Sequence, residues 1–136
     1  MVFGGINYIA IVIAAVAAFM AGGVYYGVLV AKPWMKAARL TEEQTEMSAS
    51  LFITTFICEL VMAIGIAGVL GHLGTGQVSL WNGVVTGFFL AVTLVIPAMT
   101  MNQRYQGYGW DLAVIDGVHW IGVAVLIGGI VGWFGV

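Results

Sequence analysis

Long apolar runs alternate with short polar connections along the whole chain. Four runs reach the roughly 20 mostly apolar residues that a helix needs to cross a bilayer. They cover residues 6–31, 49–70, 80–101 and 111–134. The second and third connections are short, which makes consecutive helices antiparallel neighbours. The pattern predicts an all-α fold, an integral membrane four-helix bundle with four transmembrane helices, forming a single domain over residues 1–136.

The connection between the first two runs is longer and more polar than the others, with the sequence KPWMKAARLTEEQTEMSAS. Pro33 suits the first turn of a short helix, and Trp34 beside basic residues suits a segment at the membrane surface. Thr41 followed by Gln44 fits a capping box that begins a helix continuing into the second span. The alternative is a plain polar linker. We expect a short interfacial cytoplasmic segment here.

Basic residues are confined to one side of the predicted bundle. They occur only in the first and third connections, whereas the second connection and both tails contain no Lys or Arg. By the positive-inside rule this side is cytoplasmic and both termini face outward. Tryptophans near the ends of the spans complete an aromatic belt. The interface anchors predicted in this way are Lys32, Trp34, Lys36, Arg39, Trp81, Arg104, Trp110 and Trp133.

The composition supports a membrane protein and argues against several other classes. Hydrophobic residues make up 62% of the 136 residues and charged residues 7%, whereas a soluble domain has about 25% charged residues. The net charge is −2 without a basic run, so we expect the lipid bilayer rather than nucleic acid as a partner. Cys58 is the single cysteine. Since metal-binding and catalytic motif spacings are missing, we expect no metal, no cofactor and no catalytic residue.

Small residues recur at spacings of four in the first and last runs. Helices in a bilayer associate through close packing, so such stripes mark contact faces. Packing within one bundle accounts for these positions, although four short helices leave room for a face used in self-association. We expect a homo-oligomer or a larger membrane complex. The predicted packing positions are Ala14, Ala18, Gly22, Gly23, Gly27, Gly128 and Gly132.

Glu59 lies in the second run, at mid-membrane depth. It is about ten residues, or roughly 15 Å, from the start of the span. A charged carboxylate at that depth costs at least about 2.5–3.5 kcal/mol, so such residues face the protein interior. Glu59 is either a protonated acid satisfied by a hydrogen bond, or a site that exchanges a proton or binds a cation or polar ligand.

Asp116 and His119 form a second polar position, in the fourth run. They are three residues apart and share one helical face. The aspartate either orients the imidazole for a function or simply satisfies a buried histidine. Most polar groups in the spans lie in the cytoplasmic half, which predicts an inward-facing polar pocket. The candidate ligand or proton site consists of Tyr25, Tyr26, Glu59, Asn102, Asp116 and His119.

Several short segments together resemble a known family. They are YYG at 25–27, KPW at 32–34, LTEE at 40–43, VMA at 61–63 and IDGVHW at 115–120, with Pro97 and Asn102. The chain resembles a widespread bacterial family of small four-helix membrane proteins catalogued as a domain of unknown function. The resemblance covers nearly the whole chain and implies a four-span bundle in a bacterial inner membrane, without an activity. Glu59 lies outside the pattern of that family.

Three functional classes fit these features. The favoured prediction is a non-enzymatic, oligomerising accessory or scaffold protein whose polar cluster specifies helix packing. The first alternative is a small proton-coupled transporter or channel that uses Glu59 with Asp116 and His119. The second alternative is a cofactor-binding membrane subunit.

Overall fold

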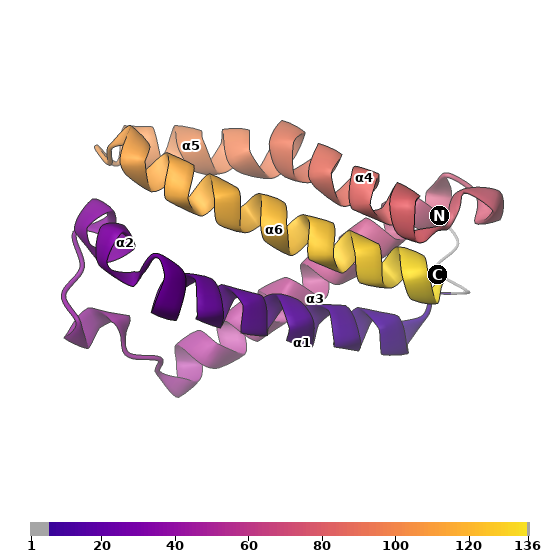
Figure 1. The fold of residues 1–136 in the computed structure, drawn as a ribbon, viewed down its shortest axis with the longest axis horizontal. Coiled ribbons are helices and arrows are strands. Elements are labelled where there is room, and N and C mark those ends of the chain that lie inside the picture. Colours follow the sequence, from indigo (N-terminus) through magenta and orange to yellow (C-terminus); the bar gives the residue numbers. More distant parts are fainter. Residues whose placement is uncertain (1–5, 136) are drawn as a thin grey trace.

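The computed structural model describes residues 6–135, and the helices of this part are shown in Figure 1. Residues 1–5 and 136 of the predicted domain lie outside the described residues. The α-helices are α1 (Tyr8–Val24), α2 (Ala31–Ala38), α3 (Ala49–His72), α4 (Leu80–Leu90), α5 (Ile96–Tyr105) and α6 (Trp110–Phe134). The π turns are η1 (Tyr25–Leu29) and η4 (Ala91–Val95), and the 3-10 turns are η2 (Glu43–Thr45) and η3 (Thr75–Gln77).

Within residues 6–135, four helical segments are long and apolar enough to cross a membrane. They are Tyr8–Leu29, Ala49–His72, Leu80–Tyr105 and Trp110–Phe134. Each agrees with a predicted span to within a few residues at its ends, so the all-α, four-span fold is confirmed. The start of α1, the end of α6 and the η3 connection lie at one end of the molecule, and α2 and the α5–α6 connection at the other (Figure 1).

The predicted interface anchors follow this arrangement. Trp81 and Trp133 are exposed at the η3 end. The remaining anchors belong to the α2 end: Lys32, Trp34, Lys36, Arg39, Arg104 and Trp110. All basic side chains therefore lie at the α2 end, and the assignment of that end to the cytoplasm stays a prediction of the positive-inside rule.

α6 is the most enclosed span, and α1, α3 and α4 pack against it. Its tightest contact is with α4, where small residues bring the two backbones together. A Cβ placed on Gly83 would lie 1.9 Å from the carbonyl oxygen of Gly128, and one on Gly87 would lie 2.0 Å from that of Ala124. A Cβ on Gly132 would lie 2.2 Å from the carbonyl oxygen of Ser79.

These contacts form three rungs, spaced four residues apart on each of the two antiparallel helices, which we call the glycine seam. It consists of Ser79, Gly83 and Gly87 facing Gly132, Gly128 and Ala124. The predicted packing residues Gly128 and Gly132 lie in it. Their partners were not identified from the sequence, although Gly83 and Gly87 have the same four-residue spacing that marks close helix packing.

The predicted packing residues of the first span divide into two groups. Ala14 and Ala18 are fully buried in the core. Gly23 and Gly27 have open space around them, since nothing lies within 4 Å of a Cβ placed on either. They lie on a different side of the helix from Ala14 and Ala18 because successive residues differ by about 100° around a helix axis. A side chain at either position would meet no neighbour in the described chain, and both glycines line a hollow between α1 and α3.

The connection between α1 and α3 contains α2 and then a separate short turn. α2 ends at Ala38, and its C-cap residue Arg39 has a left-handed backbone conformation with φ of 59°. The Gln44 carboxamide oxygen accepts a hydrogen bond from the Thr41 N–H at 2.9 Å, but the turn stops before α3. α3 has its own N-cap, where the Ser48 hydroxyl accepts from the Leu51 N–H at 3.1 Å. The predicted helix running from Thr41 into the second span is therefore wrong.

Candidate functional site

A cavity of about 860 Å³ opens between α1, α3 and the α2 segment, and we call it the α1–α3 cavity. It forms because α3 runs obliquely to the other spans, so that its first turns diverge from α6 (Figure 1). Its walls are largely aromatic and apolar, with a few polar groups. The residues that line the cavity include Phe19, Tyr26, Trp34, Glu42, Thr54, Cys58, Glu59, His119 and Trp120.

Glu59 is the most buried ionisable side chain of the cavity wall. It lies in the middle of α3, on the face that carries Ala63, Ile66 and Ala67 into the core, and it is only 4% exposed. The side chain faces the interior, in the direction that the sequence predicts. Its Oε2 atom is buried and has no hydrogen-bond partner within residues 6–135. Because a buried acceptor without a partner is costly, this oxygen is suited to receive a donor from outside the chain.

His119 projects from α6 into a cage of aromatic rings and is 8% exposed. Its ring centroid lies 4.7 Å from that of Tyr26, 5.5 Å from Tyr25 and 5.0 Å from Trp120. The fourth side of the cage is Gly22, where a Cβ would lie 3.1 Å from Cε1 of the imidazole. Gly22, predicted as a packing residue, therefore makes room for His119.

Asp116 is bonded to two other helices. Its Oδ1 accepts a hydrogen bond from the Tyr26 hydroxyl at 2.8 Å, and its Oδ2 accepts one from Nε2 of Gln103 at 2.7 Å. Tyr25 hydrogen-bonds the Ile115 carbonyl at 2.8 Å beside it. We call Asp116, Tyr26 and Gln103 the Asp116 network. It links η1, α5 and α6, and Tyr26 is its member in the cavity wall.

The sequence predicts a hydrogen bond between the side chains of Asp116 and His119, but the two side chains form none within residues 6–135. The two residues share a face of α6, but Asp116 lies one turn nearer the α2 end, where both of its oxygens are taken by η1 and α5. The predicted site therefore separates into two parts. Glu59 and His119 line the cavity, and Asp116 holds one of its walls from behind.

Asn102 is exposed and does not line the α1–α3 cavity, so the structure does not bring it together with Glu59 and His119. The buried amide is the next residue, Gln103, which is 8% exposed. In an uninterrupted α-helix Gln103 would lie roughly opposite Gly83, which faces α6. The π turn η4 adds one residue to the helix and rotates Gln103 by about 100° towards α6.

Pro97 gives the only local signal for this change of register. It has no N–H to bond the carbonyl four residues earlier, and its ring crowds that carbonyl. The π turn η4 directly precedes α5, the helix that contains Pro97.

Within residues 6–135, no three His, Cys, Asp or Glu side chains are grouped as a metal ion would require.

The chain belongs to the family described as "Protein of unknown function (DUF1761)", whose family model matches residues 9–132. This confirms the resemblance to a family of unknown function over nearly the whole chain. Neither the curated proteins nor the solved structures include a match to the chain. The family description names no activity, so the function has to be inferred from the cavity.

Proposed function

We propose that the protein binds a small amphipathic organic cation in the α1–α3 cavity and exchanges it for a proton on Glu59, as a small membrane transporter. The observation that carries this proposal is Glu59, which lines the cavity and whose Oε2 is buried without a hydrogen-bond partner in the described chain. An ionisable residue inside a membrane span marks an ion or substrate path more often than it serves packing alone.

The charges in the cavity wall favour a cation as the ligand. The wall contains two carboxylates, Glu59 and Glu42, and none of its lining residues is Lys or Arg. An isolated carboxylate is costly at mid-membrane depth, so Glu59 holds a proton when the cavity is empty. A bound cation compensates the negative charge and lets the proton leave, which makes binding and proton release two sides of one exchange.

The aromatic walls suit an apolar, positively charged molecule. The rings of Tyr26 and Trp34 pack with centroids 4.8 Å apart, and Trp120 and Phe19 complete the wall. Aromatic faces attract cations and also bury hydrocarbon, which is the combination that an organic cation needs.

The cavity is open on the side that faces lipid. Leu51, Thr54 and Cys58 are exposed on α3 and also line the cavity. An amphipathic ligand therefore has a path from the bilayer between α1 and α3, and Glu42 lines the cavity beside the α2 segment. Such a ligand can enter from the bilayer without passing through an aqueous channel.

Binding of tetraphenylphosphonium to the purified protein tests the proposal directly. Glu59→Gln should weaken binding roughly tenfold or more, because it removes the counter-ion in the cavity wall. Asp111→Asn, which removes an exposed acid of α6 outside the cavity, is the matched control and should leave binding unchanged. Equal affinity of the wild type and Glu59→Gln would refute the proposal.

Proton release gives a second measurement on the same samples. In weakly buffered solution the wild type should release close to one proton per bound cation, and Glu59→Gln should release none. In proteoliposomes, a proton gradient should drive cation uptake by the wild type only. The single cysteine adds a site-specific readout, since a bound cation should slow maleimide labelling of Cys58.

Self-association as an accessory or scaffold protein is the second candidate function. Gly23 and Gly27 favour it, because both are exposed and nothing lies within 4 Å of a Cβ placed on either, although both also line the α1–α3 cavity. Gly128 and Gly132 are already occupied by the glycine seam. Size-exclusion chromatography with light scattering tests this candidate. A wild-type oligomer that becomes smaller in Gly23→Leu supports the scaffold role, and a monomeric wild type counts against it. Cation binding is not the control here, because Gly23 also lines the α1–α3 cavity.

A further inference from the structure

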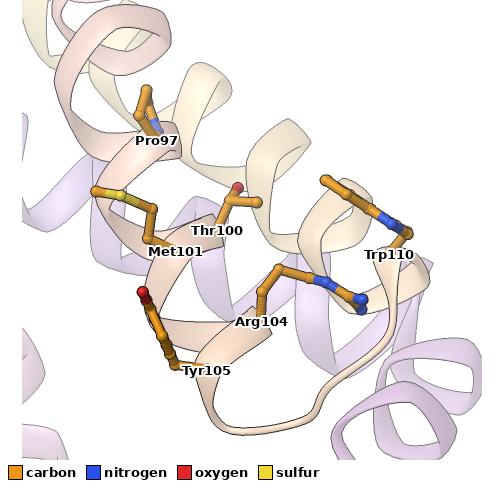
Figure 2. A pocket seen from close by; sticks show the side chains of 6 residues that line it. All are labelled: Pro97, Thr100, Met101, Arg104, Tyr105 and Trp110. Atoms are coloured by element: carbon orange, nitrogen blue, oxygen red, sulfur yellow. The ribbon is translucent and has the colours of Figure 1, made fainter.

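A second hollow, of about 520 Å³, lies on the outer face of α5 (Figure 2). Its residues follow one helical face at spacings of three and four, and Trp110 closes it from the start of α6. The lining consists of Pro97, Thr100, Met101, Arg104, Tyr105 and Trp110. It is separate from the α1–α3 cavity and shares no residue with it.

Arg104 is the charged group of this hollow, and it is held in place by neutral partners. Its side chain extends towards Trp110 (Figure 2), with the guanidinium 5.1 Å from the ring centroid. Its Nη1 donates to the carbonyl of Tyr108. A guanidinium has five N–H donors in a fixed fork, so donors remain for an oxyanion while the side chain is already oriented. Asp111, the acid next to Trp110 in sequence, does not line the hollow.

The rest of the hollow is apolar and runs along α5 towards the membrane interior. Met101 and Pro97 are exposed on α5, about one and two turns further from the α2 end than Arg104, respectively. Tyr105 is 94% exposed at the level of the charge. One end of the hollow therefore suits a negatively charged group and the other suits a hydrocarbon chain.

We infer that this hollow binds an anionic phospholipid, with Arg104 holding the phosphate and an acyl chain lying along Met101 and Pro97. The α2 end, where all the basic side chains gather, is the end that the positive-inside rule assigns to the cytoplasmic leaflet. That leaflet carries the anionic lipids, and basic side chains at its surface attract them. A free anion would leave the apolar part of the hollow unused, which is why a lipid is the better occupant. This inference does not depend on the proposed cation site.

Native mass spectrometry of the protein released from micelles tests the inference, with phosphatidylglycerol and phosphatidylcholine added at equal concentrations. The wild type should hold its first phosphatidylglycerol roughly tenfold more tightly than phosphatidylcholine, because both carry a phosphate but the choline cation of phosphatidylcholine offsets that charge beside the guanidinium. Arg104→Gln should bind the two lipids equally. Arg104→Lys, which keeps the charge but loses the planar fork, should show an intermediate preference.

Arg39→Gln is the matched control. Arg39 also donates to a backbone carbonyl, that of Gly107 at 2.7 Å, and it also stacks over a ring, that of Tyr108 at 5.3 Å. It does not line the hollow, so its loss should leave the lipid preference within about twofold. An equal loss in Arg39→Gln and Arg104→Gln would overturn the inference in favour of diffuse attraction. Displacement of the lipid by equimolar inorganic phosphate would overturn it in favour of a soluble anion.

Discussion

Gly83→Ala should destabilise the protein more than Gly22→Ala or Gly122→Ala, each of which also adds one methyl group. The added Cβ would lie 1.9 Å from the carbonyl oxygen of Gly128 and 3.2 Å from Cα of Gly132. All of these neighbours are backbone atoms, so no side chain can rotate away. Since ordinary contacts begin near 3.4 Å, α4 and α6 would have to separate by roughly 1.5 Å at this rung.

The cost follows from what that separation does to the whole glycine seam. A gap of about 0.5–1 Å already removes a quarter to a half of the dispersion energy of each atom pair. The rungs on either side, at Gly87 and Gly132, would open as well because α4 and α6 are rigid helices. Overpacking of this kind typically costs about 1–3 kcal/mol, and the lack of any movable side chain places Gly83→Ala at the upper end of that range.

The protein is heated in mild detergent, and size-exclusion chromatography measures the fraction that stays folded and monodisperse. The melting temperature is the temperature at which half of that fraction is lost. Gly83→Ala should lower the melting temperature by roughly 4 °C or more. Gly122→Ala is the control, since Gly122 lies in α6 with nothing within 4 Å of a Cβ. It should melt at the wild-type temperature or slightly above, because alanine favours helix. Equal melting temperatures for the two variants would refute the close approach of α4 and α6.

Three further predictions concern the residues around the polar groups. Tyr26→Phe removes one donor to a carboxylate. It should lower the free energy of unfolding by about 0.6 kcal/mol, the average for a hydrogen bond between membrane helices, and by no more than about 1.7 kcal/mol, as denaturant titration in micelles would measure. Gln103→Leu should lower the melting temperature, whereas Asn102→Leu, on the exposed side of the helix, should not, and the reverse order would contradict the rotation at η4. Gly22→Ala places a methyl group 3.1 Å from the imidazole of His119 and should weaken cation binding by displacing that ring, which isothermal titration would detect as a raised dissociation constant.

The four spans could be predicted from the sequence because a bilayer leaves few choices. Every backbone polar group in hydrocarbon must be bonded internally, so an apolar run of sufficient length has to form a helix. The direction of Glu59 was predictable for the same reason, since a carboxyl facing lipid is costly and one facing the interior is less so. Both predictions depend on the solvent around the helix and need no knowledge of its neighbours.

The contacts between spans were not predictable in the same way. Spacing identifies Gly128 and Gly132 as a small-residue stripe, but it does not say which stripe faces it, since Gly23 with Gly27 fits as well as Gly83 with Gly87. Asp116 likewise has a predictable face on its helix and an unpredictable partner. Its partners come from residues 90 and 13 positions away along the chain, and their approach depends on how η1 and α5 pack against α6.

The two π turns explain why the polar groups meet where they do. η1 carries Tyr26, and η4 sets the rotation of Gln103, so both donors to Asp116 depend on an irregular turn. π turns within α-helices are rare, and they occur frequently at functional sites. Tyr26 is at once the partner of Asp116 and part of the cavity wall. A change at Gln103, which does not line the cavity, should therefore alter cation binding through Asp116 and Tyr26. If Gln103→Leu lowers stability without altering cation binding, the network serves packing alone.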